Sequence, residues 1–191
     1  MEQIRLNELE INFLSESYKG LTYNETNNTI SGILSFYRSY NGKKVKGKYS
    51  IEFKLEHGNN SILPKVRETK GKILSIAKRK KISRAEVHLN NEEGEMCLIF
   101  PVKETEFYPN GFEFKRFMNH IETHLYWVTF YDRYDKKPWK DEPHCFNDAL
   151  FLSIKENKDY RKYLKINLEE KLKIKLTRPE FRRYLKKNNL L

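Results

Sequence analysis

A strict alternation of apolar and polar residues over 48–55 constrains the fold of this chain more than any other feature. The apolar members of this segment are Tyr49, Ile51, Phe53 and Leu55. Successive side chains of a β-strand point to opposite faces, so the segment predicts a strand with one face in a hydrophobic core and the other in water. Strands of this kind are typical of antiparallel sheets. We therefore expect an antiparallel sheet that is covered on one side.

Neighbouring segments predict the other strands of this sheet. Residues 29–40 are rich in β-branched and aromatic side chains and end at Asn41-Gly42, a dipeptide typical of a tight hairpin turn. After a second turn at 57–60, residues 61–73 predict a third strand, and residues 85–89 predict a short fourth one. We expect an antiparallel meander of about four strands.

Helical patterns lie before and after the strands. Residues 3–18 carry apolar side chains at mixed helical spacing, and 112–126 do so again, followed by a further aromatic run. Helices are also predicted over 147–166 and 168–175, and Thr177 opens a Thr-x-x-Glu pattern that fits a capping box for a last helix. A helix, a meander and then helices indicate the α+β fold class.

The length of the chain indicates a sizeable hydrophobic core, and its cysteine content indicates a protein without disulfide bonds. A chain of 191 residues can bury a sizeable core without disulfides, and 14% of these residues are aromatic. There are two cysteines, Cys97 and Cys145, and no signal-peptide pattern. No apolar run approaches the roughly 20 residues that span a bilayer. We therefore expect a cytoplasmic protein with no membrane contact.

The positive charge of the chain is concentrated at its end. The formal net charge is +11, and residues 153–191 contain 13 Lys and Arg against five Asp and Glu. Two domains are predicted, residues 1–150 and a basic helical extension over 151–191. A solvated helical face and a surface for nucleic acid or for an acidic protein are both open interpretations of this extension.

One stretch between the strands and the later helix combines residue types that can do chemistry. Residues 86–98 read EVHLNNEEGEMCL, so that His88 and Asn90 precede a turn at Gly94 and then Cys97. This string resembles the active-site signature of ubiquitin-conjugating enzymes, in which a His-x-Asn motif precedes the cysteine that carries a thioester. The resemblance implies a ubiquitin-conjugating (UBC) fold.

Two further segments extend the resemblance over residues 1–150. Pro64-x-Val66-x-Glu68 is similar to the strand that leads into the signature. Residues 137–144 (KPWKDEPH) resemble a Trp-Pro segment of the bacterial ubiquitin-conjugating-like proteins encoded in CBASS antiphage operons. The chain departs from these relatives at Cys145, where they tend to have Gly, and by an extra residue between His88 and Cys97.

Each candidate residue has a chemical reason beside the resemblance. A thiol such as Cys97 is intrinsically nucleophilic, and its thioester keeps a high acyl-transfer potential toward an amine. The amide of Asn90, with Asn91 as the alternative, could donate a hydrogen bond to the oxyanion. His88 is either a structural residue that hydrogen-bonds the loop or a base. His144 could lower the pKa of the thiol or accept a proton.

The remaining polar candidates are weaker. Asp141 and Glu142 could orient an attacking amine, and Cys145 is a bystander or a redox partner of Cys97. His120 and His124 have the spacing of metal ligands on one helix face, but no third ligand accompanies them, so ordinary surface or core histidines are the preferred interpretation. We expect neither a metal nor a cofactor.

The resemblance implies a cysteine-thioester transferase in antiviral defence. Its acyl donor would be the C-terminus of a cyclic-oligonucleotide synthase of the CD-NTase type, and its acceptor would be a protein amine. The alternative is a non-catalytic UBC-fold module that uses residues 153–191 to bind nucleic acid or a protein partner. The sequence leaves the oligomeric state, including a homodimer, open.

Overall fold

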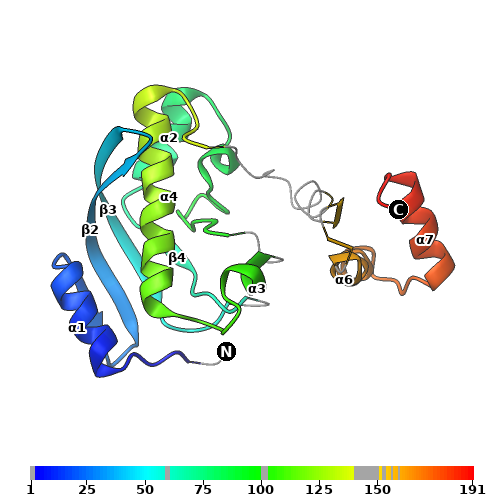
Figure 1. Cartoon of the computed structure of the whole chain (residues 1–191), viewed down its shortest axis with the longest axis horizontal. Helices are drawn as coiled ribbons and strands as arrows, with labels where there is room; N and C mark the ends of the chain where they lie inside the picture. The colour runs from blue at the N-terminus through cyan, green and yellow to red at the C-terminus, as the bar shows by residue number, and fades with distance from the viewer. Residues whose placement is uncertain are drawn as a thin grey trace. The chain divides into compact units, whose positions relative to one another are not determined.

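The expected antiparallel sheet is present and has four strands in the order β1-β2-β3-β4 (Figure 1). The structure is a computed structural model that describes residues 3–58, 61–99, 103–139, 151, 154–155, 157–158 and 160–191. The chain divides into two compact units, Met1–Asp141 and Glu142–Leu191. The sheet belongs to the first unit. Its strands are β1 (Leu21–Asn24), β2 (Thr29–Tyr40), β3 (Lys43–Lys54) and β4 (Val66–Glu68).

The hairpin of β2 and β3 is the longest part of the sheet. The two strands pair from Thr29↔Lys54 to Tyr40↔Lys43, and Asn41 and Gly42 form the connecting turn with φ of 49° and 75°. Positive φ at both central residues is the property of a type I′ turn, which Asn-Gly favours. The predicted strand over 29–40 is confirmed, and the strand predicted over 48–55 begins earlier, at Lys43.

One strand prediction is confirmed only in part, and another is wrong. Of residues 61–73, only Val66–Glu68 is a strand, because the buried carboxylate of Glu68 accepts the backbone N–H groups of Lys70 and Ile73 and so starts helix α2 (Lys72–Lys80). Residues 85–89 are not a strand either, since the 3₁₀ helix η1 (Arg84–Val87) occupies most of them. The first strand of the sheet, β1, is one that the sequence pattern did not reveal.

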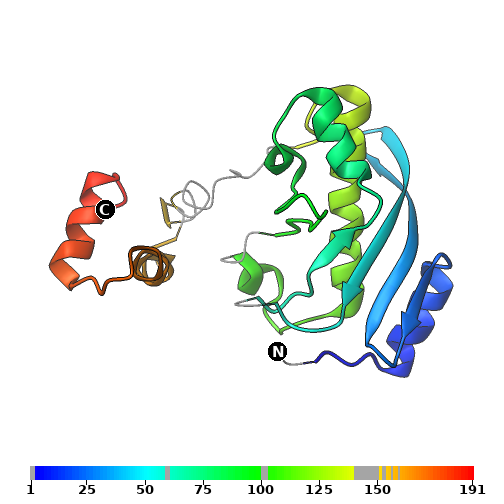
Figure 2. The ribbon, with the colours of Figure 1, turned by 180° about the vertical axis from the view of Figure 1, so that it is seen from behind.

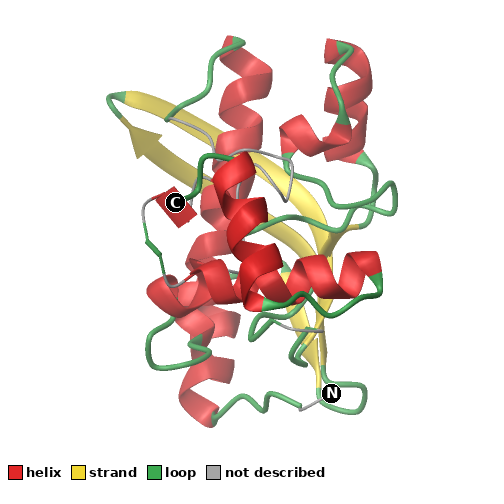
Figure 3. Cartoon of the chain, turned by 90° about the vertical axis from the view of Figure 1, so that its right-hand side faces the viewer, coloured by secondary structure: helices red, strands yellow, loops and turns green. Residues whose placement is uncertain are grey.

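Helix α4 (Phe114–Tyr134) lies across the inner face of the sheet (Figures 1 and 3). The predicted helix over 112–126 and the aromatic run after it are thus a single helix. Phe117 meets Phe53 edge to face with ring centroids 5.4 Å apart, and the Tyr49 hydroxyl lies 2.8 Å from Thr129 Oγ1. These contacts join the alternating strand to α4 and form the centre of the core.

Helix α1 (Glu8–Ser17) begins later than the predicted 3–18 because Asn7 and Glu10 form a capping box at its start. Glu122 of α4 then links this end of the chain to the sheet. Its carboxylate accepts hydrogen bonds of 2.6 Å from the Tyr18 hydroxyl and of 2.6 Å from Arg38 Nε. The predicted N-terminal helix is therefore confirmed with a shorter span.

The second unit is described by itself and contains α6 (Tyr160–Leu172) and α7 (Arg178–Lys187). Thr177 and Glu180 form the predicted capping box. The α+β class is confirmed by the mixture of helices with an antiparallel sheet. Among the described residues, no helix has both the length and the apolar composition that crossing a membrane requires.

The core contact of α4 can be tested by truncation. Phe117→Ala should lower the free energy of unfolding by about 3–5 kcal/mol, because the Phe117 ring is fully buried against Phe53 and leaves a cavity. Phe107→Ala, at a side chain that is 41% exposed, should cost about 1 kcal/mol or less. Urea denaturation followed by circular dichroism measures both, and equal losses would contradict this placement of the core.

Candidate functional site

The stretch that carries the signature folds back on itself as a short hairpin, residues 88–97, here called the Cys97 hairpin. The backbone N–H of Cys97 donates to the carbonyl of His88 at 2.8 Å, and the N–H of Asn90 donates to the carbonyl of Glu95 at 2.8 Å. Between these bonds Leu89 and Met96 form an antiparallel bridge. The register therefore places Cys97 directly opposite His88 at the base of the hairpin.

Backbone contacts fix the Cys97 hairpin to strand β4. Glu68 N–H donates to the Gly94 carbonyl at 2.9 Å, and Met96 N–H donates to the Val66 carbonyl at 2.8 Å. Gly94 has a φ of 89°, and a Cβ built there would lie 2.2 Å from the Glu68 carbonyl oxygen. Only glycine permits this backbone conformation and this close approach at little cost. The expected turn at Gly94 is thus also a docking point.

Alternation along the hairpin separates a core face from a less buried face. Leu89 and Met96 are 3% and 4% exposed and belong to the core. Side chains of neighbouring positions point the other way, so Cys97 shares the opposite face with His88, Glu95 and Asn90. Cys97 itself is half-buried. Asn90 is diagonal to Cys97 in this register, a relation in which Cβ atoms are about 7–8 Å apart.

The two asparagines play different parts in the turn. Asn91 Oδ1 accepts the N–H groups of Glu93 and Glu95, each at 3.1 Å, so this side chain shapes the turn. The exposed Asn90 donates one amide N–H to Glu95 Oε1 at 3.0 Å, and its second amide N–H makes no hydrogen bond to a described residue. Asn90 is consequently the asparagine that can donate to an incoming group without loss of the turn.

His88 anchors the base of the hairpin to α4. Its ring meets Trp127 edge to face with centroids 4.5 Å apart and lies 5.7 Å from the ring of His124. Its backbone has a φ of 57° and ends η1, with its N–H bonded to the Ala85 carbonyl at 2.9 Å. These contacts fix the ring of His88 between the hairpin and α4, and its role as a structural residue or as a base stays a prediction.

Sequence reasoning missed the part of α4 that faces the hairpin. His124 and Trp127 lie one helical turn apart and are 7% and 2% exposed. Within the part of the chain that the structure describes, Trp127 Nε1 has no hydrogen-bond acceptor. Helical spacing in the sequence could have grouped these two residues on one face, but no pattern indicates which loop covers that face.

Four candidates cannot be placed against this geometry. His144, Cys145, Asp141 and Glu142 lie outside the described residues. Their expected roles as base, redox partner and orienting carboxylates stay predictions.

The pair of histidines with metal-ligand spacing is divided between two environments. His120 Nδ1 lies 2.8 Å from the Tyr108 hydroxyl, whereas His124 lies against His88. Burial first, and the Arg116 guanidinium second, lower the pKa of His120, while burial raises the pKa of Tyr108 above its usual range. A phenol that donates to a neutral imidazole satisfies both groups. No group of three or more potential metal ligands occurs among the residues that the structure describes.

A buried carboxylate stabilises the segment that follows the hairpin. Glu104 of α3 (Glu104–Phe107) is 5% exposed and accepts hydrogen bonds from the Ser61 hydroxyl at 2.7 Å and from the Ile62 N–H at 2.9 Å. Burial raises the pKa of Glu104 although both hydrogen bonds lower it. Glu104 thereby ties α3 to the loop that precedes β4.

Comparisons with protein-family models, with curated proteins and with solved structures found no match for this chain. The residues and the geometry described above are therefore the basis for a functional assignment.

The docking of the hairpin through Gly94 can be tested with a matched pair of variants. Gly94→Ala places a Cβ at a φ of 89°, and Gly111→Ala places one at a φ of 85°. Only the Cβ at position 94 lies within 4 Å of a backbone atom. Gly111→Ala should cost about 1–2 kcal/mol of stability. Gly94→Ala should cost a further 1–3 kcal/mol or so, because the hairpin must move from β4. Thermal unfolding measures the difference, and equal costs would show that the close contact does not stabilise the fold.

The raised pKa of Glu104 predicts a pH dependence of stability. The folded state favours the protonated carboxyl, so the contribution of Glu104 is largest below its unfolded-state pKa of about 4.3 and is lost as the pH rises through the folded pKa. Glu104→Gln can accept the Ile62 N–H through its amide oxygen and donate an amide N–H to Ser61 Oγ, and it should lose this pH dependence. Urea denaturation from pH 4 to 8 should show the wild type losing stability relative to Glu104→Gln as the pH increases. A difference in the free energy of unfolding that does not change with pH would contradict a raised pKa of Glu104.

Proposed function

We propose that this chain is a cysteine-dependent acyltransferase of the ubiquitin-conjugating type and that Cys97 carries the acyl group as a thioester. The observation on which the proposal rests is the position of Cys97. It lies half-buried at the base of a hairpin that backbone hydrogen bonds and a glycine contact hold to the sheet. The exposed amide of Asn90 shares its face.

The chemistry needs two acyl-transfer steps. In the first, the Cys97 thiolate attacks an activated acyl carbonyl, the C–S bond forms and the activating group leaves with its electron pair. In the second, an amine attacks the thioester, a C–N amide bond forms, the C–S bond breaks, Cys97 leaves as a thiolate with the electron pair and the amine nitrogen gives up a proton. Both steps pass through an oxyanion, and a donor such as Asn90 typically contributes about 10²–10³-fold in rate.

The resemblance to the CBASS-encoded proteins supports the choice of partners. By that resemblance, the C-terminal carboxyl of a cyclic-oligonucleotide synthase is the acyl donor, and a protein amine is the acceptor. The sequence has no Gly-rich phosphate-binding loop with which it could adenylate the carboxyl itself. A separate activating protein therefore supplies the activated carboxyl in this proposal.

A second candidate function follows from the end of the chain. Helix α7 exposes Arg182, Arg183, Lys186 and Lys187. Clustered exposed cations favour a polyanionic or acidic partner. A non-catalytic module that binds through this helix would lose its function when residues 153–191 are deleted and would keep it in Cys97→Ala.

The transferase proposal predicts a covalent intermediate on one cysteine. When the chain is coexpressed with a synthase and an activating enzyme, intact-mass spectrometry should find a product equal to the two masses minus water. In the wild type this adduct should be cleaved by hydroxylamine, because a thioester reacts with nitrogen nucleophiles. Cys97→Ser should form a more stable oxygen ester, and Cys97→Ala should form no adduct.

Cys145→Ala is the matched control, since it removes the other cysteine of the chain. It should leave the adduct unchanged. An adduct that persists in Cys97→Ala, or that disappears in Cys145→Ala while Cys97 is intact, would refute the assignment of the nucleophile.

A further inference from the structure

The outer face of the β2–β3 hairpin is open to solvent and carries a regular pattern of side chains. Even-numbered residues of β2, such as Leu34 and Phe36, are buried under α4, so odd-numbered residues point away from it. Tyr37 is 64% exposed on this outer side. On β3 the exposed residues Lys44, Lys46 and Lys48 have the same orientation.

The register places each of these lysines beside a hydroxyl group. The cross-strand pairs are Ser39↔Lys44, Tyr37↔Lys46 and Ser35↔Lys48. We call these six residues the outer ribbon face. Because the strand period is two residues, neighbouring lysines on this face are about 6.8 Å apart along β3. The face is thus a ladder of ammonium and hydroxyl groups around one aromatic ring.

The charge of this face is not neutralised. No carboxylate is among its six residues, and within the described residues Lys44, Lys46 and Lys48 form no ion pair. Farther along β3 the pattern changes. There the cations are paired, Arg67 with Glu52 at 2.7 Å and Lys54 with Glu56 at 2.8 Å. The unneutralised charge is therefore confined to the half of the ribbon that lies near its turn.

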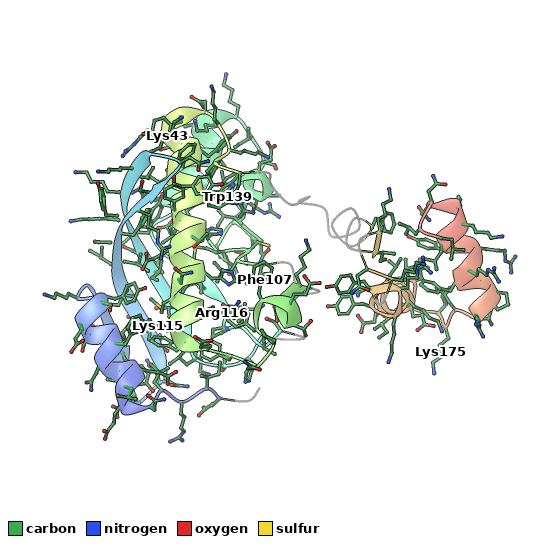
Figure 4. The ribbon with its side chains drawn as sticks, in the orientation of Figure 1. Lys43, Phe107, Lys115, Arg116, Trp139 and Lys175 are labelled. Atoms are coloured by element: carbon green, nitrogen blue, oxygen red, sulfur yellow. The ribbon has the colours of Figure 1, made fainter. Side chains whose placement is uncertain are left out.

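The turn itself is held in place from the inner side. Lys43, at the start of β3, lies over the rings of Phe130 and Tyr134 with Nζ 5.4 Å and 4.9 Å from their centroids. Tyr40 meets Trp139, which stacks on Tyr126 of α4. Figure 4 shows Lys43 and Trp139 toward this end of α4, and the view from behind in Figure 2 shows the long strands beside the helix. The ladder is thus presented by a supported ribbon and not by a loose hairpin.

We propose that the outer ribbon face binds single-stranded nucleic acid. Lys44, Lys46 and Lys48 contact successive backbone phosphates together with the hydroxyls of Ser35 and Ser39, and Tyr37 stacks on a base. Ammonium groups and hydroxyls are common phosphate donors, and an exposed aromatic ring amid positive charge is typical of sequence-tolerant single-strand binding. The exposed ring is what favours nucleic acid over an acidic peptide. This inference does not depend on Cys97 or on the proposed transferase activity.

The experiment is a fluorescence-anisotropy titration of the full chain into a labelled oligo(dT) of about 15 nucleotides at several salt concentrations. Wild type should bind with a strong salt dependence. The triple variant K44Q/K46Q/K48Q should reduce the slope of log K against log salt by about 2, since each phosphate contact contributes about 0.7 for single strands. Tyr37→Ser should bind about 5- to 100-fold more weakly, whereas Tyr37→Phe should retain binding.

The matched control is K19Q/K70Q/K78Q, which removes the same charge from exposed positions outside the outer ribbon face. It should leave the slope unchanged. The proposal is overturned if this control loses binding while K44Q/K46Q/K48Q keeps it, or if wild type shows no binding at low salt. It is also overturned if poly-glutamate competes as well as the oligonucleotide at equal charge and Tyr37→Ser has no effect. Circular dichroism confirms that each variant is folded.

Discussion

Glu68 is the residue through which the sheet, a helix and the candidate site are joined. Its backbone N–H holds the Gly94 carbonyl of the Cys97 hairpin, and its buried carboxylate accepts N–H groups at the start of α2. A buried carboxylate costs stability unless its oxygens are hydrogen-bonded, and here both oxygens accept a backbone donor. The end of β4 consequently holds both the start of α2 and the Cys97 hairpin in place.

The position of the hairpin explains why a reactive thiol at this place is chemically reasonable. Leu89 and Met96 anchor one side of it in the core, and the ring of His88 packs on Trp127 of α4. Cys97 is therefore held by rigid elements and remains half-buried. Functional groups on supported elements keep their geometry better than groups on free loops. In the proposed reaction this support lets Asn90 meet a developing negative charge, while Asn91 preserves the turn.

Local patterns in the sequence predicted the elements that local forces determine. The alternation around Tyr49, the Asn41-Gly42 turn and the capping box at Thr177 all reappear in the structure. The strand predictions failed where a contact with residues distant in the sequence determines the conformation. The pattern around Ile73 predicts a strand, but the carboxylate of Glu68 caps a helix there. The pattern of residues 85–89 also predicts a strand, but these residues form η1 and the base of a hairpin. The sequence could single out Cys97, His88 and Asn90 by their spacing. It could not reveal Trp127 and His124, because their place beside the hairpin depends on how α4 packs.

The central claim is that the sulfur of Cys97 is accessible and reactive in the folded protein. The most direct measurement is the rate of iodoacetamide alkylation at each cysteine across pH, resolved by peptide mass spectrometry with and without urea. Cys97 should be alkylated in the native protein at a rate that rises with pH as the thiolate forms. Modification of Cys97 only after unfolding would show a sequestered structural thiol and would contradict the account.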